Sequence, residues 1–141
     1  MRTVRDEDGT VYVLRKESGE SSLVEDPETG ERRHLPNEEL EPVDGESPLA
    51  TASRAVPEAV RAVVTATHDE RALGLLLEID ARGPVDVRSL MGYDLCESDL
   101  HGLLAEFRAA GLVVETDVAG ARGYETTELA STGLDALVAE R

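Results

Sequence analysis

Six side chains between residues 88 and 124 offer the chemistry most useful for recognition in this sequence. They are hydrogen-bond donors and cations, namely Arg88, Ser98, His101, Arg108, Arg122 and Tyr124. Groups of this kind hold phosphates and other anions without covalent chemistry. No glycine-rich phosphate loop, no nucleophile motif and no recognisable carboxylate pair accompanies them. We therefore expect a binding protein rather than an enzyme, with no catalytic residue and no cofactor.

Three of the candidates also have a simpler structural explanation. Ser98 could cap a helix, His101 could be a solvated helix residue, and Arg122 could pair with a nearby acid such as Glu125. Cys96 is the only cysteine, so it cannot form an internal disulfide, which agrees with a reducing compartment. One cysteine and scattered histidines make a poor ligand set, and no metal site is expected.

The helix that would carry three of these residues is predicted by its apolar spacing. One helical face is formed at i, i+3, i+4 and i+7 by Leu100, Leu103, Leu104 and Phe107. We expect this helix over 97–110, opened by Glu97 or Ser98 and stopped by Gly111. After it we expect a strand over 112–118, a turn over 119–123, a returning strand over 124–127, and a closing helix capped by Thr127.

Two further helices are predicted upstream. Pro57 opens one through about Thr67, with Val60, Val63 and Val64 on one face. Asp69 caps the next, whose mostly apolar stripe is predicted at Leu73, Leu76, Leu77 and Asp80. Gly83 and Pro84 end it, and a short extended piece and a short helix follow up to Tyr93.

The chain before these helices reads as strands and turns. Turn signals alternate with short runs at Thr10–Arg15, Ser22–Glu25 and 31–35, which predicts three or four antiparallel strands in a small module, 1–43. Residues 44–56 read as an acidic linker and a short helix with Ser47 as cap and Pro48 in its first position. Residues 57–141 form the remaining domain. The module is too small to stand alone, so it must pack on the second domain or on a partner copy.

The order of elements after residue 69 carries a family resemblance. The segments "ERALGLLLEI", "VDVRSLMGYDLCESDLHGLLAEFRAAGLVVE" and "GYETTELASTGLDAL" are similar to the winged helix-turn-helix transcriptional regulators of bacteria and archaea. The resemblance covers residues 69–137, about half the chain. It implies an α+β fold in which a winged helix-turn-helix domain follows the small antiparallel β-strand module.

The resemblance also implies roles in binding double-stranded DNA. Helix 97–110 would enter the major groove, where Ser98 and His101 reach base edges. Arg88 and Arg108 would hold phosphates. The wing, 117–124, would place Arg122 and Tyr124 at a minor groove. We expect a homodimer, because an isologous two-fold pair is the commonest oligomer. It would form through helix 57–67, the C-terminal helix, or both, and would place two reading helices about one DNA turn apart.

The charge of the chain has its own explanation. There are 30 acidic and 14 basic residues, a net charge of −16, and 13 of the bases are Arg. The acids are spread evenly, with a net −8 in residues 1–48 and again in 49–141. With few aromatics and one Lys, the composition resembles proteins of salt-accumulating haloarchaea, which use high net charge for solubility. No signal peptide or run of about 18 apolar residues is present, so we expect a cytoplasmic protein and no membrane partner.

The predicted reading helix departs from its family. Asp99 and Glu106 would face a polyanion, and Gly102 and Ala105 stand where such regulators carry polar or basic residues. Two unit charges ~4 Å apart repel by ~1 kcal/mol in water, although molar salt screens this. The alternative is a winged-helix module that docks onto another protein and binds no DNA.

Overall fold

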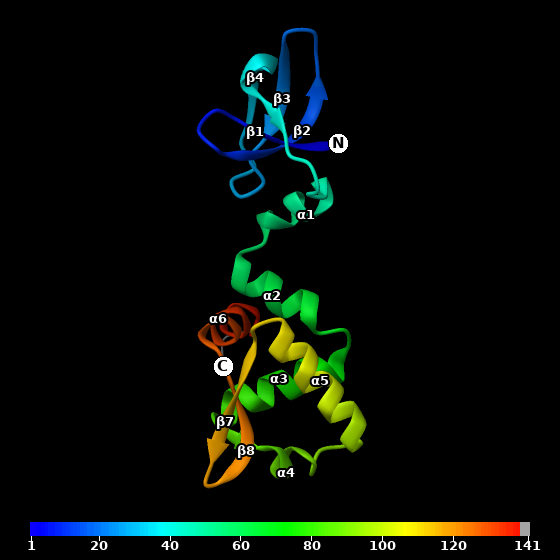
Figure 1. Cartoon of the computed structure of the whole chain (residues 1–141), viewed down its shortest axis with the longest axis vertical. Coiled ribbons are helices and arrows are strands. Elements are labelled where there is room, and N and C mark those ends of the chain that lie inside the picture. The colour runs from blue at the N-terminus through cyan, green and yellow to red at the C-terminus, as the bar shows by residue number, and fades with distance from the viewer. Residues whose placement is uncertain (139–141) are drawn as a thin grey trace. The chain divides into compact units, whose positions relative to one another are not determined.

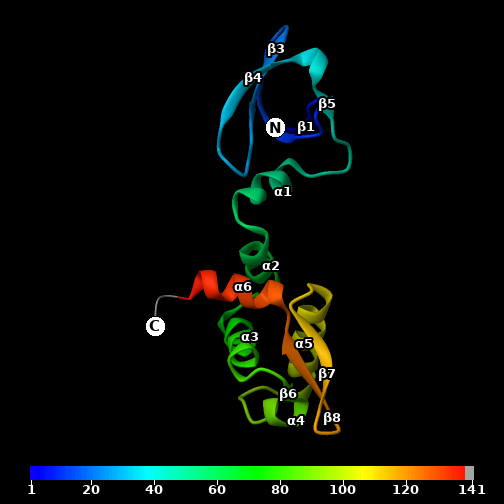
Figure 2. The same ribbon diagram turned by 90° about the vertical axis from the view of Figure 1, so that its left-hand side faces the viewer.

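The computed structural model describes residues 1–138 and divides the chain into two compact units, Met1–Pro57 and Glu58–Arg141 (Figures 1 and 2). Both units combine helices with antiparallel strands, which confirms the α+β class. Residues 139–141, the end of the predicted domain 57–141, lie outside the described residues. Among the helices of residues 1–138, none combines the length and apolar character needed to cross a membrane.

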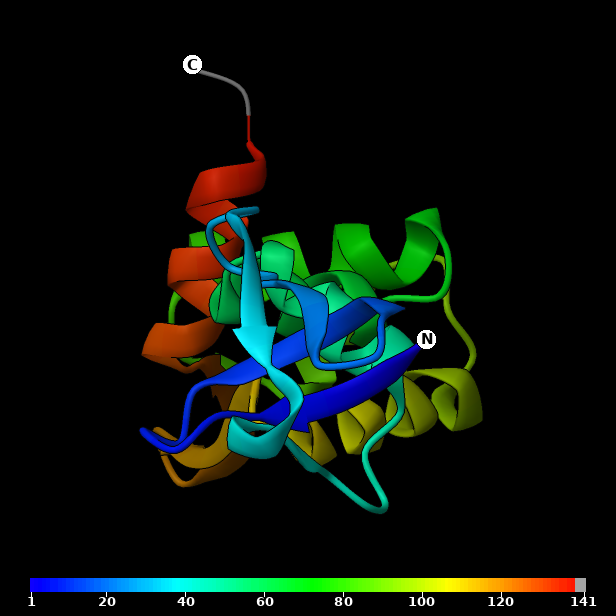
Figure 3. The same cartoon turned by 90° about the horizontal axis from the view of Figure 1, so that it is seen from above.

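The first unit is built on a five-stranded antiparallel sheet. Its strands, in the order β4-β3-β2-β1-β5, are β1 (Arg2–Arg5), β2 (Val11–Glu17), β3 (Ser21–Glu25), β4 (Arg32–Pro36) and β5 (Glu41–Pro42). Seen from above, β4 crosses over β1 and β2 (Figure 3). The prediction of three or four strands was too low, because β1 and β5 lie outside the three predicted runs. Strand β5 forms by pairing with β1. A 3-10 turn, η1 (Asn37–Glu39), precedes β5.

Both faces of this sheet bury apolar side chains. Val4, Tyr12, Leu14, Val24 and Leu35 form the core on one face. Val13 is also fully buried, and it is paired with Thr3, whose side chain contacts a helix described below. A register shift between Leu14 and Lys16 follows this stretch of β2. Burial on both faces explains why the sequence of β2 shows no clean apolar alternation.

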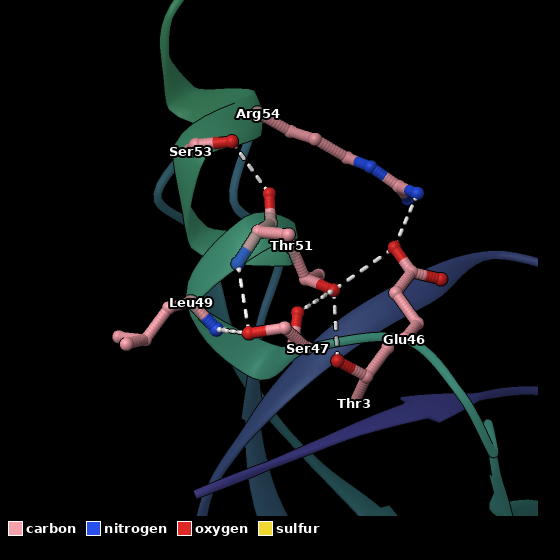
Figure 4. Close-up of polar contacts among 8 residues, drawn as sticks. Thr3, Glu46, Ser47, Leu49, Thr51, Ser53 and Arg54 are labelled. Atoms are coloured by element: carbon pink, nitrogen blue, oxygen red, sulfur yellow. Dashed lines mark hydrogen bonds and ion pairs between the residues drawn. The ribbon is translucent and has the colours of Figure 1, made fainter.

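The short helix α1 (Pro48–Ala52) is docked on the first unit by hydrogen bonds, drawn in Figure 4. Ser47 caps it, as predicted, by accepting from the amides of Leu49 and Ala50. The buried Thr51 hydroxyl lies 2.8 Å from that of Thr3 in β1 and donates to Glu46, which also binds Arg54. Segment 44–56, expected as a linker, is therefore largely part of the first unit, ending in the 3-10 turn η2 (Ser53–Ala55).

The second unit contains five helices and a small sheet within the described residues. The helices are α2 (Glu58–Ala66), α3 (Glu70–Arg82), α4 (Val87–Leu90), α5 (Glu97–Ala109) and α6 (Glu128–Leu137). The strands β6 (Val85–Asp86), β7 (Val113–Val118) and β8 (Ala121–Thr126) form an antiparallel sheet in the order β6-β8-β7. As predicted, Asp69 and Thr127 cap α3 and α6 through backbone amides.

The helices bury their apolar faces in one core, with two corrections to the predicted stripes. The α5 stripe is confirmed at Leu100, Leu104 and Phe107, which are buried, whereas its fourth predicted member, Leu103, is only half-buried. The α3 stripe is rotated, because Leu73 and Leu77 are only half-buried and the core side is formed by Ala72, Leu75, Leu76 and Ile79. In α2, Val63 is buried but Val64 is 55% exposed. Helix α6, which packs on α2, covers the Val63 side.

Asp80, the polar residue of the predicted α3 stripe, is half-buried and serves as a hydrogen-bond acceptor. Its Oδ1 accepts hydrogen bonds from Thr126 in β8 at 2.8 Å and from Ser131 in α6 at 2.6 Å. Helix α3 is therefore joined at one carboxylate oxygen to β8 and α6, through residues 46 and 51 positions further along the chain. This arrangement holds the hairpin β7–β8 to α3 and α6.

The hairpin turn is tighter than predicted. Val118 pairs with Ala121, so the turn consists of Ala119 and Gly120 alone. Both have positive φ, 51° and 86°, as a two-residue turn that matches strand twist requires. The predicted five-residue turn 119–123 was wrong, because the last three of those residues extend β8. Gly123 is among them, and it permits close approach of β6: a Cβ there would lie 2.5 Å from the Val85 carbonyl oxygen.

Candidate functional site

Four of the six predicted site residues lie around one hollow between α5 and β8. His101 and Arg108 line it from α5, and Arg122 and Tyr124 line it from β8. The hollow has a volume of ≈ 450 Å³ and also contacts Ala105 and Ala109. Figure 2 shows the hairpin running alongside α5. We call this feature the helix–hairpin hollow.

Helical periodicity determines which α5 side chains reach the hollow. His101, Ala105 and Arg108 follow the spacing i, i+4 and i+7, so they form a stripe next to the buried stripe of Leu100, Leu104 and Phe107. Burial of the stripe formed by Leu100, Leu104 and Phe107 fixes the rotation of α5 about its axis. It thereby leaves His101 and Arg108 exposed beside the hairpin. The small Ala105 leaves room between them.

Strand register determines the other side of the hollow. Glu115 in β7 is paired with Tyr124 in β8, and Arg122 lies two residues away on the same strand, so these three side chains share a face. Glu115 Oε1 lies 2.9 Å from Arg122 Nε, and Glu115 Oε2 lies 3.2 Å from Arg108 Nη1. One carboxylate therefore bridges an arginine of the helix and an arginine of the hairpin.

Tyr124 holds Arg122 in place. The tyrosine is buried, and its hydroxyl accepts a hydrogen bond from Arg122 Nη2 at 2.9 Å. The guanidinium carbon of Arg122 lies 5.7 Å from the centre of the Tyr124 ring, within cation–π range. This hydrogen bond, reinforced by Glu115, raises the pKa of the Arg122 guanidinium above its usual value. We call Arg108, Glu115, Arg122 and Tyr124 the arginine–glutamate cluster.

Ser98 lies outside the helix–hairpin hollow. The helix-cap explanation for Ser98 was wrong, because Cys96 occupies the cap position of α5 and provides no side-chain cap. The Ser98 hydroxyl lies 3.4 Å from Cys96 Sγ. It lines a second hollow of ≈ 380 Å³ together with Arg71 and three acidic residues, Asp69, Asp99 and Glu106.

Arg88 is exposed on α4, which begins with a strong cap. Asp86 accepts from the Ser89 hydroxyl at 2.6 Å and from its amide at 3.1 Å. These two hydrogen bonds lower the pKa of Asp86. The capped turn presents Arg88 to solvent, but Arg88 is not among the residues that line the helix–hairpin hollow.

The residue that sequence reasoning missed is Glu115. Glu125 was the expected partner of Arg122, but it is paired with Val114 and lies on the opposite face of the hairpin. Counting by twos from a turn at Ala119 and Gly120 places Asp117 and Glu115 on the face of Arg122 and excludes Glu125. His101 also has an acidic neighbour, since its Nε2 lies 3.6 Å from Glu97, one turn earlier in α5.

The cluster has a small net positive charge of its own, although Asp117 opposite Arg122 and Glu97 beside His101 are neighbouring acids. Two guanidinium groups and one carboxylate leave a net +1, whereas residues 58–141 contain 16 acids and 7 bases, a net −9. All three charged side chains are accessible, with 57%, 56% and 39% of Arg108, Arg122 and Glu115 exposed. Within residues 1–138, no group of three or more His, Cys, Asp or Glu is placed to hold a metal ion.

Together these features define an acidic α+β protein of two units that presents paired arginines beside a helix and a hairpin. The chain belongs to the Family of unknown function (DUF7346), whose model matches residues 1–138. No curated protein and no solved structure matches the chain.

Proposed function

We propose that the second unit is a winged helix-turn-helix domain that binds double-stranded DNA as a transcriptional regulator of a halophilic archaeon. In this proposal α3, α4 and α5 form the trihelical unit, α5 enters the major groove, and the β7–β8 hairpin is the wing. The order of these elements supports it. So does the exposure of Ser98 and His101 on the first turns of α5, where such a helix approaches base edges.

The observation that carries the proposal is the helix–hairpin hollow. His101, Arg108, Arg122 and Tyr124 come from segments about 20 residues apart, yet they line one accessible concavity. Arginine is the residue best suited to bind phosphate through paired N–H groups. The prearranged Arg122 would lose little conformational freedom on binding a phosphate or entering a groove.

The acidic surface sets the conditions for binding. Glu97 and Asp99 in the first turn of α5 are exposed and would repel DNA at low salt. At molar salt the Debye length is ~3 Å, so this repulsion is largely screened. We expect binding that depends less steeply on salt than binding by an ordinary basic repressor.

Fluorescence anisotropy with a labelled duplex, measured from ~0.2 to ~2 M KCl, tests the proposal. Arg88→Gln, Arg108→Gln and Arg122→Gln should each weaken binding and make its salt dependence less steep, because each removes a positive charge that faces phosphate. Arg2→Gln removes the same charge from the first unit and serves as the matched control. Equal effects of all four substitutions would contradict the proposed interface.

We propose a two-fold homodimer as the binding species. Val64 of α2 and Leu137 of α6 are about half exposed, 55% and 46%, on the two helices expected to pair. A two-fold axis would place two α5 helices about one DNA turn apart. Sedimentation of the anisotropy samples gives the number of subunits.

The second candidate is a winged-helix module that docks onto a protein and not onto DNA. The acidic first turn of α5 favours it, as does Val114, which is 45% exposed on the outer face of the hairpin. Absence of duplex binding by the wild-type chain across the whole salt range would support this candidate over the first.

A further inference from the structure

Glu115 occupies the space where a phosphate would bind two arginines. Its oxygens each contact a different guanidinium, Oε1 with Arg122 and Oε2 with Arg108, at 2.9 and 3.2 Å. A carboxylate is planar and a phosphate is tetrahedral, but both are oxyanions that accept pairs of N–H bonds from arginine. The cluster is therefore already arranged around an oxyanion.

The contact is open to exchange. Both arginines are more than half exposed and Glu115 is 39% exposed, so water and external anions reach the ion pairs. A guanidinium has five N–H donors, and the contacts described here use one nitrogen of Arg108 and two of Arg122. Exposed ion pairs are weak: each favours the paired over the unpaired state by only about 1.4- to fivefold.

We infer that Arg108 and Arg122 form a binding site, the seat, for one phosphate group of the DNA. Glu115 competes with that phosphate for the two arginines and must leave the seat when DNA binds. This inference rests on the proposed function. The anchoring of Arg122 on Tyr124 keeps one side of the seat in place when the carboxylate leaves. Glu115 thus sets the affinity and the salt dependence of the contact.

The competitor makes binding weaker and less dependent on salt. Each phosphate contact must replace an internal ion pair, so fewer counterions are released than by two unpaired arginines. Removing the carboxylate charge should therefore tighten binding. Two exposed ion pairs together correspond to an effect of about two- to thirtyfold. The salt slope should become steeper by ~0.9, equivalent to one additional phosphate charge neutralised.

Glu115→Gln in the full chain is the test, and Glu125→Gln is its matched control. Both remove one negative charge from the same hairpin without changing side-chain size, but Glu125 lies on the face away from the arginines. The first measurement is anisotropy with a labelled DNA duplex across the salt series. The second is a titration with inorganic phosphate, followed by the NMR signals of the Arg108 and Arg122 Nε–Hε groups.

The expected result is duplex binding about two- to thirtyfold tighter for Glu115→Gln than for Glu125→Gln, with the steeper salt slope confined to the former. Equal affinities and slopes for the two variants would overturn the inference. If no variant binds duplex, the phosphate titration decides whether Arg108 and Arg122 bind phosphate in competition with Glu115. Arginine signals that respond at lower phosphate in Glu115→Gln would retain the seat while rejecting DNA binding, and equal responses would reject both.

Discussion

Helices α2 and α6 pack so closely that only glycine fits at residue 133. A Cβ built on the buried Gly133 would lie 2.8 Å from both the carbonyl carbon of Ala59 and Val63 Cγ2. Carbon atoms in contact prefer 3.5–4.0 Å, so Gly133→Ala requires the two helices to separate by ~0.7 Å or more. The Ala59 backbone cannot rotate out of the way as a flexible side chain could.

The size of the effect follows from two opposing terms. Overpacking a core costs ~1–3 kcal/mol, and a clash with backbone belongs in the upper part of this range. Alanine also stabilises the helix by ~1 kcal/mol relative to glycine, because its helix propensity is higher. The net loss is ~1–2 kcal/mol, which corresponds to a fall in Tm of ~4–16 °C for a unit of this size.

Thermal unfolding followed by helical circular dichroism measures the effect. Gly74→Ala in α3 is the matched control, since a Cβ at Gly74 would meet no atom within 4 Å. It should raise Tm by ~4–8 °C through helix propensity alone. A Gly133→Ala protein that gains as much stability as Gly74→Ala would refute the close packing of α2 on α6.

Two further predictions concern the two sheets. Glu25 accepts hydrogen bonds at 2.8 Å from both Arg15 and Arg32, which lower its pKa, so Glu25→Gln should destabilise the first unit at neutral pH. A carboxyl pKa that is lower in the folded state adds stability at pH values above the unfolded pKa. The stability advantage of the wild type over Glu25→Gln, measured by urea unfolding, should therefore vanish as pH falls through the folded pKa. A difference that is independent of pH would contradict the ion-pair explanation. Gly123→Ala would place a Cβ 2.5 Å from the Val85 carbonyl oxygen and 2.7 Å from Val118 Cγ2. It should cost ~2 kcal/mol or more in unfolding experiments by displacing β6 from β8, and an unchanged unfolding midpoint would argue against this contact.

Local patterns accounted for much of the second unit. The α5 stripe could be predicted because residues i, i+3, i+4 and i+7 share a face in any α-helix. The caps at Asp69 and Thr127 could be predicted because a capping side chain bonds to amides two or three residues away. These interactions involve only neighbouring residues, and the surrounding fold does not alter them.

Predictions failed where distant segments decide the outcome. β5 exists because β1 offers it an unpaired edge, although residues 41–42 have little strand character of their own. The buried side of α3 faces the rest of the core, so Ala72 and Leu75 are buried more deeply than Leu73 and Leu77. Segment 44–56 resembles a linker in composition, but Thr51 finds a hydrogen-bond partner in Thr3, 48 residues earlier.

The sequence by itself determined the acidic surface, the supply of arginines and the positions of the main helices of the second unit, because composition and helical periodicity are properties of the chain. Only the tertiary structure decided that Glu115, and not Glu125, meets Arg122. Side chains alternate between the two faces of a strand, so the length of the turn at Ala119 and Gly120 assigns one glutamate to the arginines and the other to the far face.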